Sequence, residues 1–112
     1  MGRIDFGKEG ESIAIEYLLS KGYKILEKNF RTKFGEIDII AKEGEYIVII
    51  EVKRRMSDSF GSPELSVNPK KQEKLKKLAL LYLYKLGKEH PVRFDVIAIR
   101  DKEIEHIENA FY

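Results

Sequence analysis

The stretch EIDIIAKEGEYIVIIEVKR, residues 36–54, decides the fold of this chain. Two β-rich runs, residues 36–42 and 46–54, are joined by Lys42-Glu43-Gly44-Glu45, a link that predicts a β-hairpin. The second run contains Ile47-Val48-Ile49-Ile50, which is apolar on both of its faces. We therefore expect this strand to be central and to be covered on both sides of the sheet.

One helix is predicted before this hairpin and one after it. Apolar residues repeat at helical spacing over residues 6–21, and Gly22 is expected to end that helix. Asn68-Pro69 predicts the N-cap and the first residue of a second helix, which ends near Gly87. Three further strands are expected, at residues 23–29, 92–100 and 103–108. The order α-β-β-β-α-β-β predicts an α/β fold with a mixed β-sheet flanked by helices.

The length and composition limit the class of protein. The chain has 112 residues, which fits a single domain over residues 1–112. It has no cysteine, which excludes a disulfide framework, a thiol nucleophile and a zinc site built from thiolates. No apolar run approaches the ~20 residues that cross a bilayer, and residues 1–20 lack the apolar core of a signal peptide. We therefore expect a cytoplasmic protein without a membrane partner.

Positive charge is concentrated in the middle of the chain. Residues 52–100 carry 12 Lys and Arg against 5 Asp and Glu, a net charge of +7, whereas residues 1–51 and 101–112 are net negative. A basic zone beside a cluster of acids is typical of a polyanion-binding surface around a metal centre. A solvated helix face rich in lysine is the alternative explanation.

Two acids, Asp38 and Glu51, interrupt apolar strand runs in which acids are depleted. If the hairpin loop has an even number of residues, Ile40 faces Ile47, and Glu51 lies diagonally beside Asp38 on the same face, roughly 7 Å away. Two carboxylates so placed repel each other, and Mg²⁺ or Mn²⁺, which take oxygen ligands, would relieve that repulsion. An odd loop would put the two acids on opposite faces.

Two more charged residues, Lys53 and Glu11, are candidates for the same site as Asp38 and Glu51. Lys53 follows Glu51 by two residues and so shares its face, where an ammonium group can orient water and neutralise developing phosphate charge. A plain salt bridge between Glu51 and Lys53 is the alternative. Glu11 falls inside the apolar arc of the first helix, where an acid is costly unless it is paired or binds a cation. A buried salt bridge, or a favourable position near the helix N-terminus, is the alternative for Glu11.

The inner stripe of the second helix turns polar at its N-terminal end, where Lys71 and Gln72 continue it. That end is expected near the acids and offers free backbone N–H groups to an anion. Lys70, Lys74 and Lys77 are expected on the other side of the helix, facing solvent and available to phosphates at most.

Four other polar residues are interpreted more simply. Arg54 and Arg55 extend the strand into the following loop, where they either contact a nucleic-acid backbone or form ordinary surface charge. Asp95 is a further acid within a strand and is expected to form a structural ion pair. His106 alternates with apolar residues in the last strand and is also expected to be structural.

Asp38, twelve intervening residues and then Glu51-Val52-Lys53 resemble the PD-(D/E)XK nuclease superfamily, whose restriction-endonuclease-like core is a helix, a mixed sheet and a second helix. Nearly the whole chain also resembles the bacterial YraN-like family of predicted endonucleases. The segments that carry this second resemblance are Gly7-Lys8-Glu9-Gly10-Glu11, Gly35-Glu36-Ile37-Asp38-Ile39-Ile40, Glu51-Val52-Lys53-Arg54-Arg55, Lys71-Gln72 and Arg93-Phe94-Asp95-Val96. The Asp-Ile-Ile and Glu-Val-Lys segments are also similar to archaeal Holliday junction resolvases. Ile37 replaces the proline that precedes the aspartate in the superfamily, a substitution that removes no ligand.

The resemblance implies a role for each site residue. Asp38 and Glu51 would be metal ligands together with the main-chain carbonyl of Val52, and Lys53 would position the attacking water. Glu11 would complete the acid cluster, directly or through water.

Lys71 and Gln72, by the same resemblance, would touch the scissile phosphate or hold the site in order. The implied reaction is phosphodiester hydrolysis assisted by Mg²⁺ or Mn²⁺, in which metal-activated water attacks in line.

These observations together predict a metal-dependent DNA endonuclease that acts on structured or branched DNA. Junction resolvases act as dimers, so the resemblance also implies a homodimer, although the sequence shows no evident dimer face. Two alternatives remain open. The first is a nucleic-acid-binding module with the same fold and no catalysis, and the second is a protein-interaction domain whose buried acids are structural.

Overall fold

The fold is known from a computed structural model, which describes residues 6–55, 67–101 and 103–111, without the side chains of residues 6–8 and 55. The elements follow the predicted order α-β-β-β-α-β-β, which confirms the predicted fold class. They are α1 (Phe6–Ser20), β1 (Lys24–Thr32), β2 (Gly35–Glu43), β3 (Tyr46–Arg55), α2 (Pro69–Leu86), β4 (Val92–Arg100) and β5 (Glu103–Phe111). No helix in the described part of the chain is long and apolar enough to cross a membrane.

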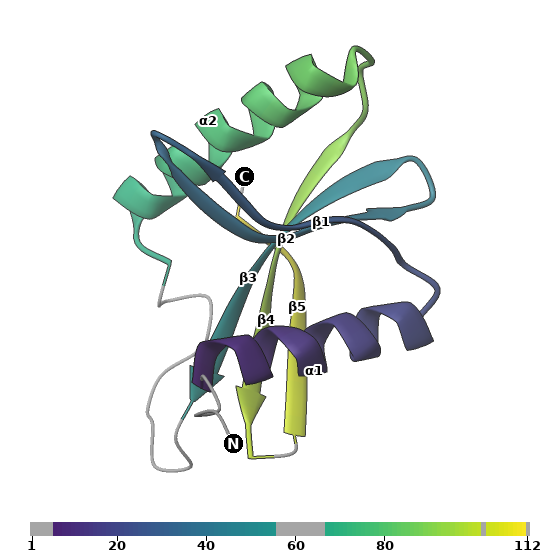
Figure 1. Cartoon of the computed structure of the whole chain (residues 1–112), viewed down its shortest axis with the longest axis vertical. Coiled ribbons are helices and arrows are strands. Elements are labelled where there is room, and N and C mark those ends of the chain that lie inside the picture. Colours follow the sequence, from purple (N-terminus) through teal and green to yellow (C-terminus); the bar gives the residue numbers. More distant parts are fainter. Residues whose placement is uncertain (1–5, 56–66, 102, 112) are drawn as a thin grey trace, which may run out of the picture.

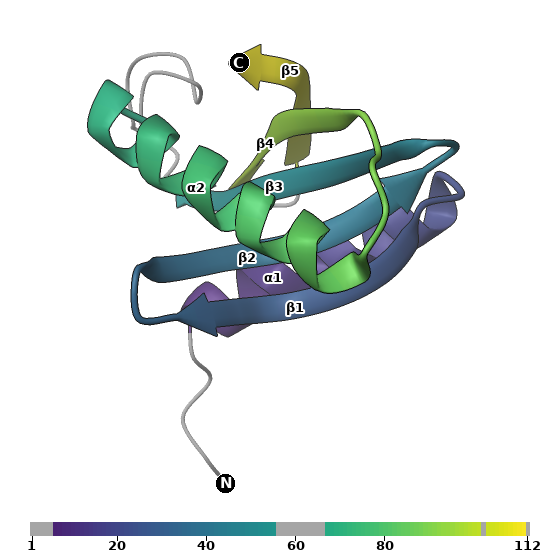
Figure 2. The same cartoon turned by 90° about the horizontal axis from the view of Figure 1, so that it is seen from above.

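The five strands form one mixed sheet in the order β1-β2-β3-β4-β5. Strands β3 and β4 are parallel and the other neighbours are antiparallel, so α2 serves as the crossover that a parallel pair requires. The two helices lie on opposite sides of the sheet (Figure 1). Figure 2 shows α2 lying across one face of the strands and α1 behind the other face.

Strand β3 is covered on both faces, as predicted from its continuous apolar run. Ile47 and Ile49 belong to the core beneath α2, whereas Val48 and Ile50 belong to the core beneath α1. All four side chains are at most 1% exposed. Strand β3 therefore contributes side chains to both cores. Burial of each large aliphatic side chain stabilises the fold by about 1.5–3 kcal/mol.

Both predicted ends of α2 are confirmed. The Asn68 side chain accepts a hydrogen bond from the Lys71 backbone N–H at 2.9 Å, and Pro69 occupies the first helical position. Gly87 ends the helix in the left-handed conformation, with φ of 75°. The first turn of α2 is therefore held firmly by its cap, which matters because Lys71 belongs to that turn.

The register of the β2–β3 hairpin differs from the prediction by two residues. Ile40 pairs with Ile49 instead of Ile47, and only two residues, Gly44 and Glu45, join the strands. Gly44 has φ of 58°, a conformation that suits the first position of a two-residue hairpin loop and favours glycine. An even shift keeps every side chain on its predicted face.

Two strands are longer than predicted. β1 continues to Thr32 and β5 continues to Phe111. Asn29 and Asn109 adopt left-handed backbone conformations, with φ of 53° and 55°. Asparagine is typical of turns, which is why the sequence pattern predicts a strand end near each of these residues. In the structure each strand continues beyond its asparagine, which only interrupts the extended conformation locally.

We predict that Gly35→Ala destabilises the protein more than Gly44→Ala. Gly35 has φ of 144°, and a Cβ there would lie 3.0 Å from Lys74 Cδ, whereas a Cβ on Gly44 would meet nothing within 4 Å. Both substitutions strain the backbone by about 1–3 kcal/mol, but only Gly35→Ala also forces the Lys74 stem on α2 to shift. Urea unfolding should show the larger loss for Gly35→Ala. Equal losses would show that the close approach of α2 is unimportant.

Candidate active site

Strands β2 and β3 separate at the acid pair, Asp38 and Glu51. The last described pair of their ladder is Ile39 with Ile50, and the next two residues in this register are Asp38 and Glu51. The shifted register therefore brings the two acids alongside each other instead of diagonally. Glu51 is 7% exposed, so one of the acids is buried.

The Asp38 side chain fills the gap where the ladder ends. Ile37 and Ile40 pack in the core beneath α2, whereas Ile39 packs beneath α1, so the regular alternation of β2 is broken at Asp38. Asp38 Oδ2 accepts a hydrogen bond from the Val52 backbone N–H at 2.9 Å. The carboxylate thus takes the place of a β2 backbone carbonyl and is fixed in position by β3.

The surroundings of Asp38 raise its pKa strongly. Burial, a hydrogen bond with Glu51 and the charge of Glu51 raise the pKa of Asp38 to about 7. The Val52 N–H and the charge of Lys71 act in the opposite direction but are weaker. An acid whose pKa is raised toward neutral pH by burial and by a neighbouring acid is typical of functional sites.

Two lysines reach the acid pair from different elements. Lys71 Nζ, from the first turn of α2, is 2.9 Å from Glu51 Oε2. Burial alone would lower the pKa of Lys71, but the hydrogen bond and the charge of Glu51 outweigh burial and raise it. Burial lowers the pKa of Lys53, and the nearby Lys71 adds to this effect, while Glu51 opposes it. Asp38, Glu51 and Lys53 therefore lie together, and Lys71, which was also expected near the acids, forms an ion pair with Glu51.

The donor set at the acid pair fits a hard divalent cation. Asp38 and Glu51 supply carboxylate oxygens. The N–H and C=O of one strand residue point to the same side, so the Val52 carbonyl points toward the gap that its N–H shares with Asp38. Carboxylate and carbonyl oxygens are the ligands that Mg²⁺ and Mn²⁺ prefer. No third acid or histidine in the described residues joins the pair closely enough to form a larger metal-binding group.

Glu11 lies partly buried on α1. Its neighbours Ala14 and Leu18 pack against the sheet, which agrees with its expected position on the inner face of the helix. Because it does not form a group of three with Asp38 and Glu51, its predicted contribution to the site, directly or through water, stays a prediction.

Gln72 has a structural contact. Its Nε2 donates a hydrogen bond to the Val67 backbone carbonyl at 2.9 Å, which ties α2 to the residue before its N-cap. Of the two predicted roles for Gln72, this contact supports the one in which it holds the site in order. Contact with a phosphate stays a prediction.

Arg54 lies on the α1 face of β3, opposite to Glu51 and Lys53. Its side chain is 16% exposed, and its Nη2 is 3.7 Å from Glu9 Oε1 at the start of α1. This packing leaves little of the guanidinium for the predicted contact with nucleic acid, which stays a prediction. The side chain of Arg55 lies outside the described residues, so its predicted contact also stays a prediction.

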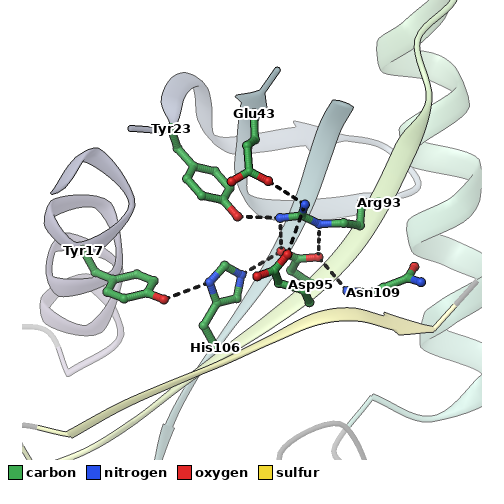
Figure 3. A network of polar contacts seen from close by, with 8 residues as sticks. Tyr17, Tyr23, Glu43, Arg93, Asp95, His106 and Asn109 are labelled. Carbon is green, nitrogen blue, oxygen red and sulfur yellow. Dashed lines mark hydrogen bonds and ion pairs between the residues drawn. The ribbon is translucent and has the colours of Figure 1, made fainter. Parts of the chain in front are cut away.

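A second polar cluster surrounds Asp95 on the α1 face (Figure 3). Arg93 donates to both Asp95 oxygens at 2.9 Å, His106 Nε2 is 2.7 Å from Oδ2, and the Asn109 N–H donates to Oδ1 at 3.0 Å. Burial would raise the pKa of Asp95, but the bonds from His106, Arg93 and Asn109 outweigh it and hold that pKa below its usual range. The structural ion pair predicted for Asp95 is present, and His106 is one of its partners.

The sequence reasoning missed the remaining members of this cluster. Tyr17 from α1 points toward His106, and Arg93 also contacts Glu43 and Tyr23 (Figure 3). The spacing of Arg93 and Asp95 on one strand face was the available signal for their pairing. The other contacts join residues that are far apart in the sequence.

A helix, a mixed sheet and a second helix, with two acids and a lysine on adjacent strands, define a PD-(D/E)XK-like protein. The model of the family described as "Uncharacterised protein family UPF0102" matches residues 10–99. The chain belongs to this family, which is the YraN family that its motifs resemble.

Relatives support this membership over the full chain. A UPF0102 protein of Thermodesulfovibrio yellowstonii is 77% identical over 112 residues, which cover all of both chains. A UPF0102 protein of Persephonella marina is 53% identical over 106 residues, covering 94% of this chain and 91% of its own. One from Syntrophus aciditrophicus is 49% identical over 110 residues, covering 94% and 87%.

We predict that Asp38→Asn stabilises the metal-free protein at alkaline pH. The raised pKa of Asp38 means that the folded state binds more protons than the unfolded state between about pH 4 and pH 7, so stability falls as pH rises through this window. The amide removes this loss and still accepts from Val52. In EDTA at about pH 8 the variant should melt about 4 °C or more above wild type, the shift that ~1 kcal/mol produces.

At about pH 3, where Asp38 is mostly protonated in both the folded and the unfolded state, this difference should be small. Glu45→Gln, which removes an exposed acid from the β2–β3 turn, is the matched control and should show no such pH dependence. A gain for Asp38→Asn that is the same at both pH values would contradict the assigned cause.

Proposed function

We propose that this protein is a metal-dependent endonuclease that hydrolyses phosphodiester bonds in DNA. The observation that carries the proposal is the pair of Asp38 and the buried Glu51 at the point where β2 and β3 separate, with Lys53 and Lys71 beside it. Membership of a PD-(D/E)XK-like family agrees with it.

In this proposal some residues of the site bind the cation and another acts on the water and the phosphate. Asp38, Glu51 and the Val52 carbonyl would hold Mg²⁺ or Mn²⁺, because they are oxygen donors facing one gap. The cation, when bound, polarises a phosphoryl oxygen and makes water a stronger acid. The Lys53 ammonium lies on the same face, where it orients the attacking water and stabilises charge that develops on the phosphate.

The surface beside this site suits a polyanion. Lys70, Lys74 and Lys77 are exposed along α2, as expected from their positions on the outer face of the helix. Lys33 is exposed in the turn between β1 and β2, and Gly35, two residues further on, lies close to the Lys74 stem. These lysines give a nucleic-acid backbone several phosphate contacts. The preference for structured or branched DNA rests on the resemblance to junction resolvases.

One observation favours a second function, a nucleic-acid-binding module without catalysis. Lys71 already neutralises Glu51 through a direct ion pair, so the acid pair has a counter-charge of its own. Such a protein would bind DNA in a salt-dependent manner but would not cleave it in Mg²⁺ or Mn²⁺. A cleavage assay over a panel of linear, flapped and branched DNA substrates separates the two functions.

We predict that Asp38→Ala and Glu51→Ala each abolish tight binding of Mn²⁺ while leaving the fold intact. Each change removes an oxygen ligand and also relieves the repulsion between the acids in the metal-free protein. Calorimetric titration should show affinity weaker by about 100-fold or more, since even outer partners of a metal site contribute about 10–100-fold. Glu45→Ala is the control. Wild-type affinity in both site variants would remove the metal centre from the proposal.

We predict that Lys53→Met lowers cleavage far more than DNA affinity. Methionine keeps an apolar stem of similar length but removes the charge beside the reacting phosphate. Cleavage in Mg²⁺ should fall by roughly 100-fold or more, whereas DNA affinity in Ca²⁺ should change by less than about tenfold. Lys77→Met, on the exposed face of α2, is the control for the loss of one lysine. Equal cleavage by wild type and Lys53→Met would show that Lys53 is only a salt-bridge partner.

A further inference from the structure

Lys71 binds the same carboxylate that is assigned to the metal. Its Nζ is 2.9 Å from Glu51 Oε2, and the Glu51 side chain is only 8% exposed. Because a buried carboxylate has few oxygen positions to offer, an ammonium at this distance competes with a cation for Glu51. The Lys71 side chain itself is 38% exposed, so it can also reach solvent and anything bound at the surface.

The charges at the site make it difficult for Lys71 and a divalent cation to share Glu51. Two acids, Asp38 and Glu51, face two ammonium groups, Lys53 and Lys71, so the charges are balanced if all four are ionised. A divalent cation would leave the site with two excess positive charges, which repel each other at short range. A phosphate close to the site would restore the balance and would offer Lys71 a new partner.

The start of α2 is fixed, so only the side chain of Lys71 has to move. The Lys71 backbone N–H is bound by Asn68 Oδ1 at 2.9 Å, and Gln72 Nε2 is bound to the Val67 carbonyl at 2.9 Å. A lysine has a flexible four-carbon stem, and its ammonium can turn from one anion to another without a change in the backbone. The backbone of Lys71 is therefore fixed, whereas its ammonium group can change partners.

We propose that Lys71 exchanges partners: it neutralises Glu51 when no metal is bound, and a divalent cation releases it to bind a DNA phosphate. The exchange rests on the proposed function, because it requires a cation at Asp38 and Glu51. It makes metal and DNA binding mutually reinforcing, since each ligand favours the arrangement that the other needs. A static salt bridge between Lys71 and Glu51 would give no such coupling.

The first test measures metal binding without DNA. Lys71→Met removes the competing ammonium, so calorimetric titration with Mn²⁺ at about pH 8 should give an affinity about tenfold higher than that of wild type. Lys71→Gln is a second variant with the same expected direction, in case methionine disturbs the packing. Lys70→Met removes an exposed lysine from the same helical turn and should leave the affinity for Mn²⁺ unchanged.

The second test measures how far a metal strengthens DNA binding. Ca²⁺ is used so that cleavage does not interfere. For wild type, the DNA affinity in Ca²⁺ should exceed that in EDTA, and Lys71→Met should reduce this ratio about tenfold. Lys70→Met should weaken binding by a similar factor with and without Ca²⁺, because it loses only a phosphate contact.

The outcomes separate the exchange from the proposed function. If wild type binds Mn²⁺ and Lys71→Met and Lys71→Gln bind it equally or more weakly, Lys71 does not compete for Glu51 and the exchange is wrong, while the metal site stands. If neither wild type nor either Lys71 variant binds Mn²⁺, both proposals are wrong. Tighter Mn²⁺ binding in both Lys71 variants, together with the smaller Ca²⁺ effect on DNA affinity, supports the exchange.

Discussion

The two-residue link between β2 and β3 fixes the register that brings Asp38 alongside Glu51. Gly44 makes this tight link by adopting a positive φ, and every pairing along the hairpin follows from it. A slip of one residue would turn one strand's side chains to the opposite face and separate the acids. The site therefore depends on hairpin geometry about as much as on the identity of its acids, and β3 holds that geometry because it is buried between two cores.

Two acids of the same sheet, the buried Asp95 and the partly buried Asp38, show opposite shifts of pKa. Asp95 is surrounded by Arg93, His106 and the Asn109 N–H, so its charge is fully compensated and its pKa is lowered. For Asp38, burial and the neighbouring Glu51 outweigh the single backbone N–H from Val52 and raise its pKa to about 7. The first arrangement ties β4, β5 and α1 together. The second keeps an acid with a raised pKa beside Glu51, and this is the arrangement on which the proposed function rests.

The order of the elements and the central position of β3 could be predicted from local patterns such as Ile47-Val48-Ile49-Ile50 and the Asn68-Pro69 cap. The acid pair could be predicted because both acids lie on adjacent strands of one hairpin. The exact register could not be predicted, because it depends on the conformation of Gly44 in the loop, which the sequence pattern alone does not specify. The contact of Lys71 with Glu51 and the packing of Arg54 beneath α1 could not be predicted in this detail, because they depend on how separate elements dock.

The parallel pairing of β3 with β4 has a consequence for how the site is assembled during folding. Both acids belong to the meander of β1, β2 and β3, whose turns are short and whose contacts are local in sequence. Lys71 arrives only when α2 docks, an event that also closes the long crossover to β4 and is therefore entropically slower. A chain that has formed its meander but not yet docked α2 holds two adjacent acids without the Lys71 counter-ion. If this pair binds a divalent cation as proposed, the cation stabilises that partly folded state, and its concentration then changes the folding rate as well as the stability of the finished protein.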